Sequence, residues 1–208
     1  MKSVIFDIET EGLDADWQLK TFEPKFKLDG RIKDAAKIEL DRREKEQEWL
    51  DEAALDAKRS RVLVIGVCSD DGSASYILEG SEADLLSRFW KCWTDNVSAK
   101  FIGHNIKGFD VPFMLRRSFV NGIIPPPDIV DGRYLNRRFI DTMELWGAGE
   151  WGAKISLDNL ARALGVGKKS ESGRDFAARY HTEKEKALLY VKHDLDLTLQ
   201  CAQKMGVI

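Results

Sequence analysis

The chain has 208 residues, of which 43% are hydrophobic and 32% charged, and its formal net charge is −3. This composition fits one globular α/β domain over residues 1–208 with a substantial core, and it argues against disordered and fibrous classes. The negative charge excludes a protein that coats nucleic acid by bulk electrostatics. No apolar stretch approaches the roughly 20 residues of a membrane-spanning helix, so we expect a cytoplasmic protein without membrane contact.

Strand patterns open the chain. Residues 4–10 form a short apolar and β-branched run closed by Gly12, which predicts a buried strand. Residues 62–68 and 74–78 predict two more strands, because the Asp71-Gly72 pair between them is typical of a hairpin turn. We expect these three strands to be antiparallel and to form half of a sheet.

A highly charged segment separates the first two strands. Residues 31–61 are dense in Glu, Asp, Lys, Arg and Ala and contain neither proline nor glycine, which predicts one long helix with a thin apolar seam. We therefore assign residues 15–60 to a helical insertion within the single domain. A solvated helix that bridges two strands is the simpler interpretation, and a lid beside a functional site is the alternative.

Helices and strands alternate in the rest of the chain. Helices are predicted over residues 81–93, 110–119, 156–164 and 182–205. Ser81 is a favourable N-cap for the first of them, and Gly165 a favourable terminator for the third. Short strands are predicted around residues 101–103 and 139–140. This order of elements predicts a mixed sheet with helices on its faces.

Two acids lie on the opening strand. Asp7 and Glu9 are two residues apart, and because side chains alternate along a strand, both project from one face while Phe6 and Ile8 point into the core. Adjacent carboxylates in a partly dry site repel one another, and a divalent cation would remove that penalty. Taken alone, the pair also fits two acids at a solvated strand end.

A third acid follows the sequence Gly103-His104-Asn105. Asp110 begins a predicted helix two residues before Pro112, where it is a favourable N-cap. Capping and metal binding are compatible, since both use the carboxylate oxygens. His104 is a single histidine and is better interpreted as structural than as a metal ligand.

The last helix carries two more acids beside an apolar stripe. Asp194 and Asp196 flank that stripe on opposite sides, so periodicity does not choose between them. Tyr190 lies one helical turn before Asp194 on the same face, and a phenol that orients a water molecule favours Asp194 as the functional acid. Asp196 fits a solvated flank better.

In this order and separation, the three groups resemble the exonuclease motifs of the DEDD superfamily. The motifs are Phe6-Asp7-Ile8-Glu9-Thr10, Gly103-His104-Asn105 with Phe109-Asp110, and Tyr190 four residues before Asp194. The tyrosine is typical of the DEDDy branch. Residues 139–143 and 156–165 are similar to connecting segments of exonucleases related to the proofreading domains of family-B DNA polymerases. The resemblance covers nearly the whole chain outside roughly residues 15–60, and the charged insertion is longer than expected for the family.

The resemblance implies an RNase H-like fold, in which a mixed sheet of three antiparallel strands plus parallel strands is flanked by helices and the charged insertion follows strand 1. The implied catalytic residues are Asp7, Glu9, Asp110, Tyr190 and Asp194. The four carboxylates would hold two divalent metal ions, Mg²⁺ or Mn²⁺, and the tyrosine would position the attacking water. The implied contacts with the terminal nucleotide are Thr10, Asn105 and Phe109.

The implied activity is that of a 3′→5′ exonuclease that releases nucleoside 5′-monophosphates. Single-stranded or frayed DNA ends are the expected substrates in preference to RNA, and proofreading or DNA repair would require a polymerase in trans. Residues 100–180 carry 13 basic and 9 acidic side chains, so a phosphate-binding face could lie there. Its candidate contacts are Arg116, Arg117, Arg137, Arg138, Lys168 and Lys169.

Two other classes of function fit part of the pattern. A phosphatase of the haloacid dehalogenase type also places an aspartate after the first strand, but that chemistry normally requires a second aspartate where this chain has Glu9. A non-catalytic nucleic-acid-binding module on the same fold is the other alternative. The acids present in all three motifs argue against it.

Overall fold

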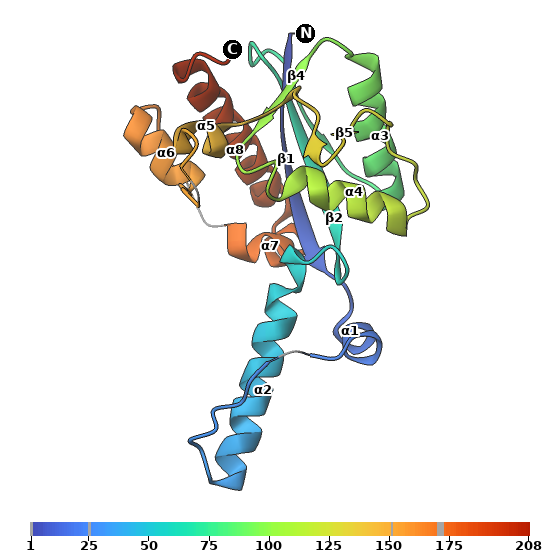
Figure 1. Cartoon of the computed structure of the whole chain (residues 1–208), viewed down its shortest axis with the longest axis vertical. Helices are drawn as coiled ribbons and strands as arrows, with labels where there is room; N and C mark the ends of the chain where they lie inside the picture. Colours follow the sequence, from blue (N-terminus) through green and yellow to red (C-terminus); the bar gives the residue numbers. More distant parts are fainter. Residues whose placement is uncertain (1, 25, 151, 170–172) are drawn as a thin grey trace. The chain divides into compact units, whose positions relative to one another are not determined.

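A computed structural model describes residues 2–24, 26–150, 152–169 and 173–208. The chain divides into two compact units, one made of Met1–Glu9 with Val62–Ile208 and the other of Thr10–Arg61. Figure 1 follows the chain through both. Within the described ranges, no helix has the length and apolar character needed to cross a membrane.

A five-stranded mixed sheet is the centre of the first unit, with the strand order β3-β2-β1-β4-β7. Strands β1 and β4 pair in parallel, as do β4 and β7, whereas β2 and β3 are antiparallel. A separate two-stranded ribbon pairs β5 with β6. The strands are β1 (Ser3–Gly12), β2 (Ser60–Ser69), β3 (Ser75–Leu78), β4 (Lys100–Gly103), β5 (Val130–Asp131), β6 (Tyr134–Leu135) and β7 (Phe139–Asp141).

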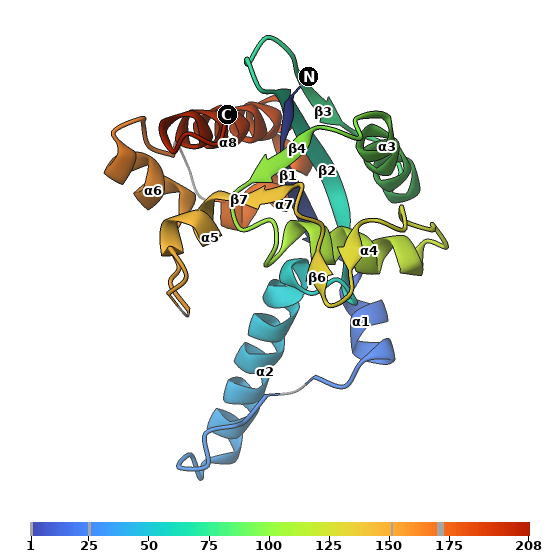
Figure 2. The same ribbon diagram turned by 45° about the horizontal axis from the view of Figure 1, so that its top comes forward.

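Helices cover both faces of this sheet, as the sequence predicts. Figure 2 shows α3 and α4 on one side and α8, with α6 beside it, on the other. The helices are α3 (Glu82–Asp95), α4 (Asp110–Val120), α5 (Thr142–Gly147), α6 (Leu157–Leu164), α7 (Phe176–Thr182) and α8 (Lys184–Lys204). Ser81 caps α3 by accepting the amide N–H of Asp84, and Gly165 ends α6 with a positive φ of 68°.

The face of the sheet beneath α3 is packed with aromatic rings. Phe6 of β1 lies 4.9 Å from the ring of Phe89 and 6.3 Å from both Phe101 and Phe139, measured between centroids. Trp93 stacks on Phe139 at 4.5 Å. These rings are buried, and they pack β1, the middle strand of the sheet, against α3.

The opposite face is packed against α8. Ile5 and Ile102 share a buried cluster with Val191 and Leu195 of that helix. Gly66 of β2 lies so close to α8 that a Cβ atom there would meet Val191 at 2.7 Å and Leu195 at 2.9 Å. A glycine at this position therefore lets the helix approach the sheet.

The second unit contains the charged insertion. Helix α1 spans Ala15–Thr21 and helix α2 spans Ala35–Asp51, and α2 has no buried residue. Ion pairs along α2 join Glu39 to Arg42 and Arg43, and Lys45 to Glu48, which explains how so charged a segment stays helical. Its acids and bases therefore largely satisfy one another.

The predicted helix over residues 31–61 is too long at both ends. Asp34 caps α2 by accepting the N–H of Lys37, so helical structure starts after it. At the other end the chain tightens into a 3-10 turn over Glu52–Leu55. Beyond that turn, the Arg59 guanidinium stacks 4.0 Å over the Trp49 ring and donates to the Trp49 carbonyl, and this contact folds the chain back.

The other differences between the predicted and observed elements concern short helices and strands. The predicted helix over residues 182–205 begins at Lys184, because Glu183 has a non-helical φ of −138° and separates it from α7. Helices α1, α5 and α7 and the β5–β6 ribbon were not predicted from the sequence. Each helix spans fewer than two turns, which is too short to show a helical period.

Candidate active site

The parallel strands end at one edge of the sheet, and the candidate site lies there. Ile5 of β1 faces α8, and because side chains alternate, Asp7 and Glu9 continue along the same face. Gly103 of β4 pairs with Asp141 of β7 at this same end. The carboxyl ends of parallel strands are the usual position of functional sites in open α/β sheets.

Helix α8 supplies the third acid. Packing of Val191 and Leu195 against β2 fixes the rotation of the helix, and this turns Asp194 inward, where it is 3% exposed. Asp196 is exposed on the other flank and bonds to Gln200. The structure therefore separates the two acids that periodicity alone left equivalent, and it selects Asp194.

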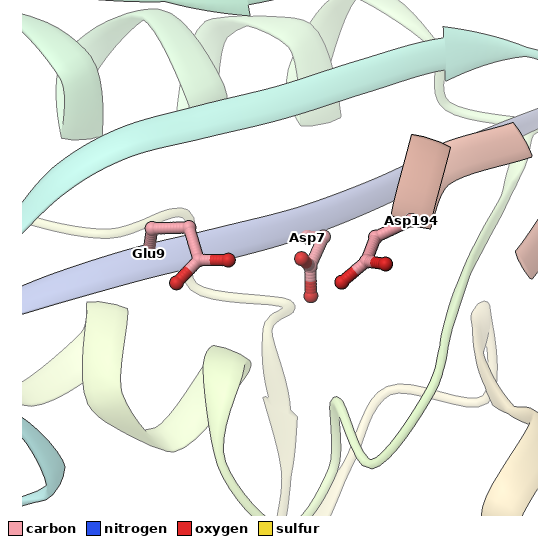
Figure 3. A group of neighbouring side chains, drawn as sticks. All are labelled: Asp7, Glu9 and Asp194. Atoms are coloured by element: carbon pink, nitrogen blue, oxygen red, sulfur yellow. The ribbon is translucent and has the colours of Figure 1, made fainter. Parts of the chain in front are cut away.

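Asp7, Glu9 and Asp194 converge. Each offers a carboxylate oxygen, and these three oxygens all lie within 4.8 Å of one another. In Figure 3 the carboxylates of Asp7 and Asp194 lie side by side, and Glu9 lies farther along β1. A single hard cation can contact oxygens spaced in this way.

The electrostatics of the cluster favour a bound cation. Burial, together with the neighbouring charge of Asp194, raises the pKa of Asp7 to about 7. Burial and the charges of Asp7 and Asp194 raise the pKa of Glu9 well above its usual value. Carboxylates whose ionised form is this unfavourable bind a divalent cation well, because the cation supplies the missing positive charge.

Asp110 lies against the same strand, although not as the predicted N-cap. Phe109 is the N-cap residue of α4, and Asp110 is the first residue of the helix. Its Oδ1 instead accepts the amide N–H of Ile8 at 3.0 Å, between the two acids of β1. Burial and the charge of Asp7 raise the pKa of Asp110. This acid is therefore electrostatically part of the cluster.

Tyr190 and Lys169 complete the surroundings of Asp194. The Lys169 ammonium lies 2.5 Å from Asp194 Oδ2 and donates to the Tyr190 hydroxyl at 2.8 Å. Burial and the charges of Asp194 and Glu9 raise the pKa of Tyr190, so its phenol keeps its proton near neutral pH. Sequence reasoning named Lys169 only as one of several basic candidates. Residue spacing carries no signal for its contact with Asp194.

The loop after β4 presents Asn105 and Phe109. Asn105 has a positive φ of 62°, and its backbone N–H donates to the carboxylate of Asp141. That carboxylate also accepts the backbone N–H groups of Lys107 and Met143, so it ties the loop to the start of α5. Sequence reasoning missed Asp141. The Asp141-x-x-Glu144 spacing, which is typical of a helix start, could have revealed it.

His104 has the structural role predicted for it. One ring nitrogen lies 2.9 Å from Thr142 Oγ1 and the other lies 2.8 Å from the Ile155 carbonyl oxygen. Both nitrogens therefore have protein partners. Burial lowers the pKa of this imidazole, which leaves it neutral.

The other candidate contacts are dispersed. Thr10 belongs to the second unit, where its hydroxyl donates to the Ala54 carbonyl at 2.6 Å, and its contact with a nucleotide stays a prediction. Arg117 is buried in a two-bond ion pair with Glu82, and Arg138 stacks 3.5 Å over the Trp93 ring. These two arginines stabilise the fold. Arg116, Arg137 and Lys168 are exposed.

The donor set fits Mg²⁺ or Mn²⁺. All three converging groups are carboxylates, which are the hard oxygen ligands that these ions prefer. Asp194 Oδ1 is also buried with no hydrogen-bond partner among the described residues. A buried carboxylate oxygen without a donor costs free energy unless a cation contacts it.

The raised pKa of Asp7 predicts how stability depends on pH without metal. The folded protein holds this proton up to about pH 7, whereas the unfolded chain releases it near pH 4. The free energy of unfolding should therefore fall as pH rises from about 4 through 7, since the folded state binds more protons there. Urea unfolding with EDTA at about pH 5 and pH 8 measures this fall, which should be smaller in Asp7→Asn and in excess Mg²⁺. An equal fall in Asp7→Asn would contradict it.

The chain matches a family model. Residues 56–196, more than half of the chain, match the model described as "Predicted 3'-5' exonuclease related to the exonuclease domain of PolB". The matched range includes Asp110, Tyr190 and Asp194 and starts after Asp7 and Glu9. No curated protein matches the chain.

Among solved structures, the family B DNA polymerase of the hyperthermophilic archaeon Pyrobaculum calidifontis is similar in fold. The TM-score is 0.62 at 19% sequence identity, and the alignment covers 98% of this chain and 24% of the polymerase chain. The chain thus spans about a quarter of that polymerase. The mixed five-stranded sheet flanked by helices is the RNase H-like fold that the sequence predicted.

Proposed function

Since the chain belongs to the family of predicted 3′→5′ exonucleases related to the exonuclease domain of PolB, we propose that it is a metal-dependent 3′→5′ exonuclease of the DEDDy type. The observation that carries this proposal is the convergence of the Asp7, Glu9 and Asp194 oxygens within 4.8 Å. The family match alone leaves catalysis open. An inactive relative would have no need to keep three mutually repelling carboxylates together in a buried site.

The proposed mechanism assigns each acid a role. Asp7, Glu9 and Asp194 would hold one divalent ion, and Asp7 would also reach a second ion held by Asp110 directly or through water. When bound, such ions lower the pKa of an attacking water and stabilise the leaving 3′ oxygen of an in-line phosphodiester displacement. The product would be a nucleoside 5′-monophosphate.

Tyr190 would orient the water rather than deprotonate it. Its phenol stays protonated because burial and neighbouring carboxylates raise its pKa. The Tyr190 hydroxyl accepts a hydrogen bond from Lys169. It can still donate its own proton to a water molecule, which is enough to orient that water. Tyr190→Phe would keep the ring and remove the hydroxyl, which is both a donor and an acceptor.

The loop after β4 would receive the terminal nucleotide. Phe109 is half-buried and lies 5.2 Å from Phe113, so one of its faces is held by the protein. Stacking of a base on an aromatic ring tolerates any sequence, as an exonuclease requires. Asn105, which the Asp141 carboxylate holds through the backbone, would supply a directional hydrogen bond beside it.

DNA with a single-stranded or frayed 3′ end is the proposed substrate, and the relation to PolB exonuclease domains supports it. The matched polymerase is far longer than this chain. A replication or repair polymerase that acts in trans is the proposed partner.

A ladder assay tests the proposal. End-labelled single-stranded and duplex DNA and RNA of one sequence are incubated with the purified chain in Mg²⁺, in Mn²⁺ and in EDTA. We expect products that shorten from the 3′ end one nucleotide at a time, only with a metal and fastest on single-stranded DNA. Binding without digestion in either metal would indicate a non-catalytic module instead.

A further inference from the structure

Lys169 is held by contacts of both its backbone and its side chain. Its backbone N–H donates to Asp158 Oδ1 at 2.8 Å, and Asp158 is itself paired with Arg162 on α6. Its ammonium reaches Asp194 Oδ2 at 2.5 Å and the Tyr190 hydroxyl at 2.8 Å. The lysine is thus directed into the acid cluster from the end of α6.

The ammonium acts as a counter-charge for the cluster. The positive charge of Lys169 opposes the rise in pKa of both Asp7 and Glu9. The Lys169 side chain is 24% exposed and the Asp194 side chain 4%, so the pair is only partly screened by water. In the absence of metal, Lys169 therefore reduces the repulsion that would otherwise push the carboxylates apart.

The same position is the one a divalent ion requires. Asp194 offers two oxygens: Oδ2 is held by Lys169, and Oδ1 is buried with no hydrogen-bond partner among the described residues. A metal ion that contacts either oxygen, including the unbonded Oδ1, would lie a few ångströms from the ammonium. A divalent ion and an ammonium this close repel one another strongly in a site that water screens only partly, so binding of the ion favours displacement of the ammonium.

We infer that Lys169 is an internal counter-ion that occupies the cation position beside Asp194 in the metal-free protein and is displaced when a divalent ion binds. The inference rests on the cation site of the proposed function but not on nuclease activity. On this account the Lys169 ammonium and the divalent ion compete for the Asp194 carboxylate, so the ammonium lowers the apparent affinity for the metal. Removing the ammonium should therefore strengthen metal binding and weaken the metal-free fold.

The direct test compares Lys169→Met with Lys168→Met. Both changes remove one positive charge from adjacent positions and keep most of the length of the side chain, but Lys168 is exposed. Mn²⁺ binding to each full-length protein is measured from the electron paramagnetic resonance signal of free Mn²⁺. We expect Lys169→Met to bind Mn²⁺ at least about tenfold more tightly than the wild type, and Lys168→Met to stay within about twofold.

Thermal unfolding gives a second reading of the same variants. Without metal, Lys169→Met should melt at a lower temperature than Lys168→Met, and saturating Mn²⁺ should raise its melting temperature by more than that of the wild type. Equal or weaker Mn²⁺ affinity in Lys169→Met, or an equal gain in Lys168→Met, would overturn the inference.

The wild-type chain offers a measurement that does not depend on a variant folding. The wild-type protein is treated with a mild amine-reactive acetylating reagent. The rate of acetylation at each lysine is measured by mass spectrometry, with peptide fragmentation to distinguish Lys168 from Lys169. Lys169 should react faster after Mn²⁺ is added, because displacement exposes its amine, while Lys168 should not change. An unchanged Lys169 rate would contradict displacement. These readouts are separate from DNA digestion, so an inactive protein could still confirm the counter-ion, and an active one could refute it.

Discussion

Replacing Asp7 with alanine is expected to lower the rate of Mg²⁺-dependent 3′-end digestion by at least roughly a hundredfold, the scale for losing one transition-state stabiliser. Asp7 lies between the other acids: its oxygen is within 4.8 Å of those of Glu9 and Asp194, and its charge acts on Asp110. Removing it therefore affects both proposed ions. Initial rates on 3′-terminal single-stranded DNA, measured with saturating Mg²⁺, provide the comparison.

Folding is not expected to explain this loss. Asp7 is destabilising when ionised in the metal-free protein, so its removal should leave the melting temperature in EDTA equal or higher. A variant that melts normally yet digests DNA at close to the wild-type rate would show that Asp7 is not a metal ligand of the reaction.

A comparably large loss is expected for Asp194→Asn, and α8 provides its control. Asparagine keeps the size of the side chain and removes the charge that a divalent ion requires. Asp196, two residues along the same helix, is exposed and accepts a hydrogen bond from Gln200. We expect roughly a hundredfold slower digestion in Asp194→Asn and less than about a twofold change in Asp196→Asn.

Metal binding by the two variants gives a second comparison, which does not depend on digestion. Asp194→Asn should bind Mn²⁺ more weakly than the wild type, while Asp196→Asn should bind it equally well. Similar activities for the two variants would contradict the assignment of Asp194 as the functional acid of α8.

Strand periodicity was enough to place the first two acids. Because side chains alternate on β1, Asp7 and Glu9 were predicted on one face and Phe6 on the other, and the structure confirms both. The rule needs only the strand itself. It required no knowledge of which elements pack against that face.

Periodicity left Asp194 and Asp196 equivalent and Tyr190 favoured Asp194, but the physical reason why Asp194 faces the other acids is tertiary. Both flank the apolar stripe of α8, and the rotation of the helix is fixed by the contact of Gly66 with Val191 and Leu195. That contact joins residues more than a hundred positions apart. No window of local sequence contains it.

The contacts missed from the sequence are of the same non-local kind. Lys169 reaches Asp194 because Asp158 holds its backbone, and Asp110 accepts from Ile8 rather than capping its own helix. For Asp110, local capping preference competed with an amide on a neighbouring strand, and the tertiary bond prevailed. The helical insertion was predicted as an element, but the Asp34 cap sets the start of α2 and the Trp49–Arg59 contact lies beyond its end.

The central claim is that the converging carboxylates bind a divalent ion, and anomalous diffraction from crystals grown with saturating Mn²⁺ tests it most directly. We predict an anomalous peak at about 2.1 Å from oxygens of Asp7, Glu9 and Asp194, the usual distance for a small divalent ion and its carboxylate ligands. Crystals that contain Mn²⁺ elsewhere, or none at all, with these three carboxylates bound only to protein or water, would contradict the claim.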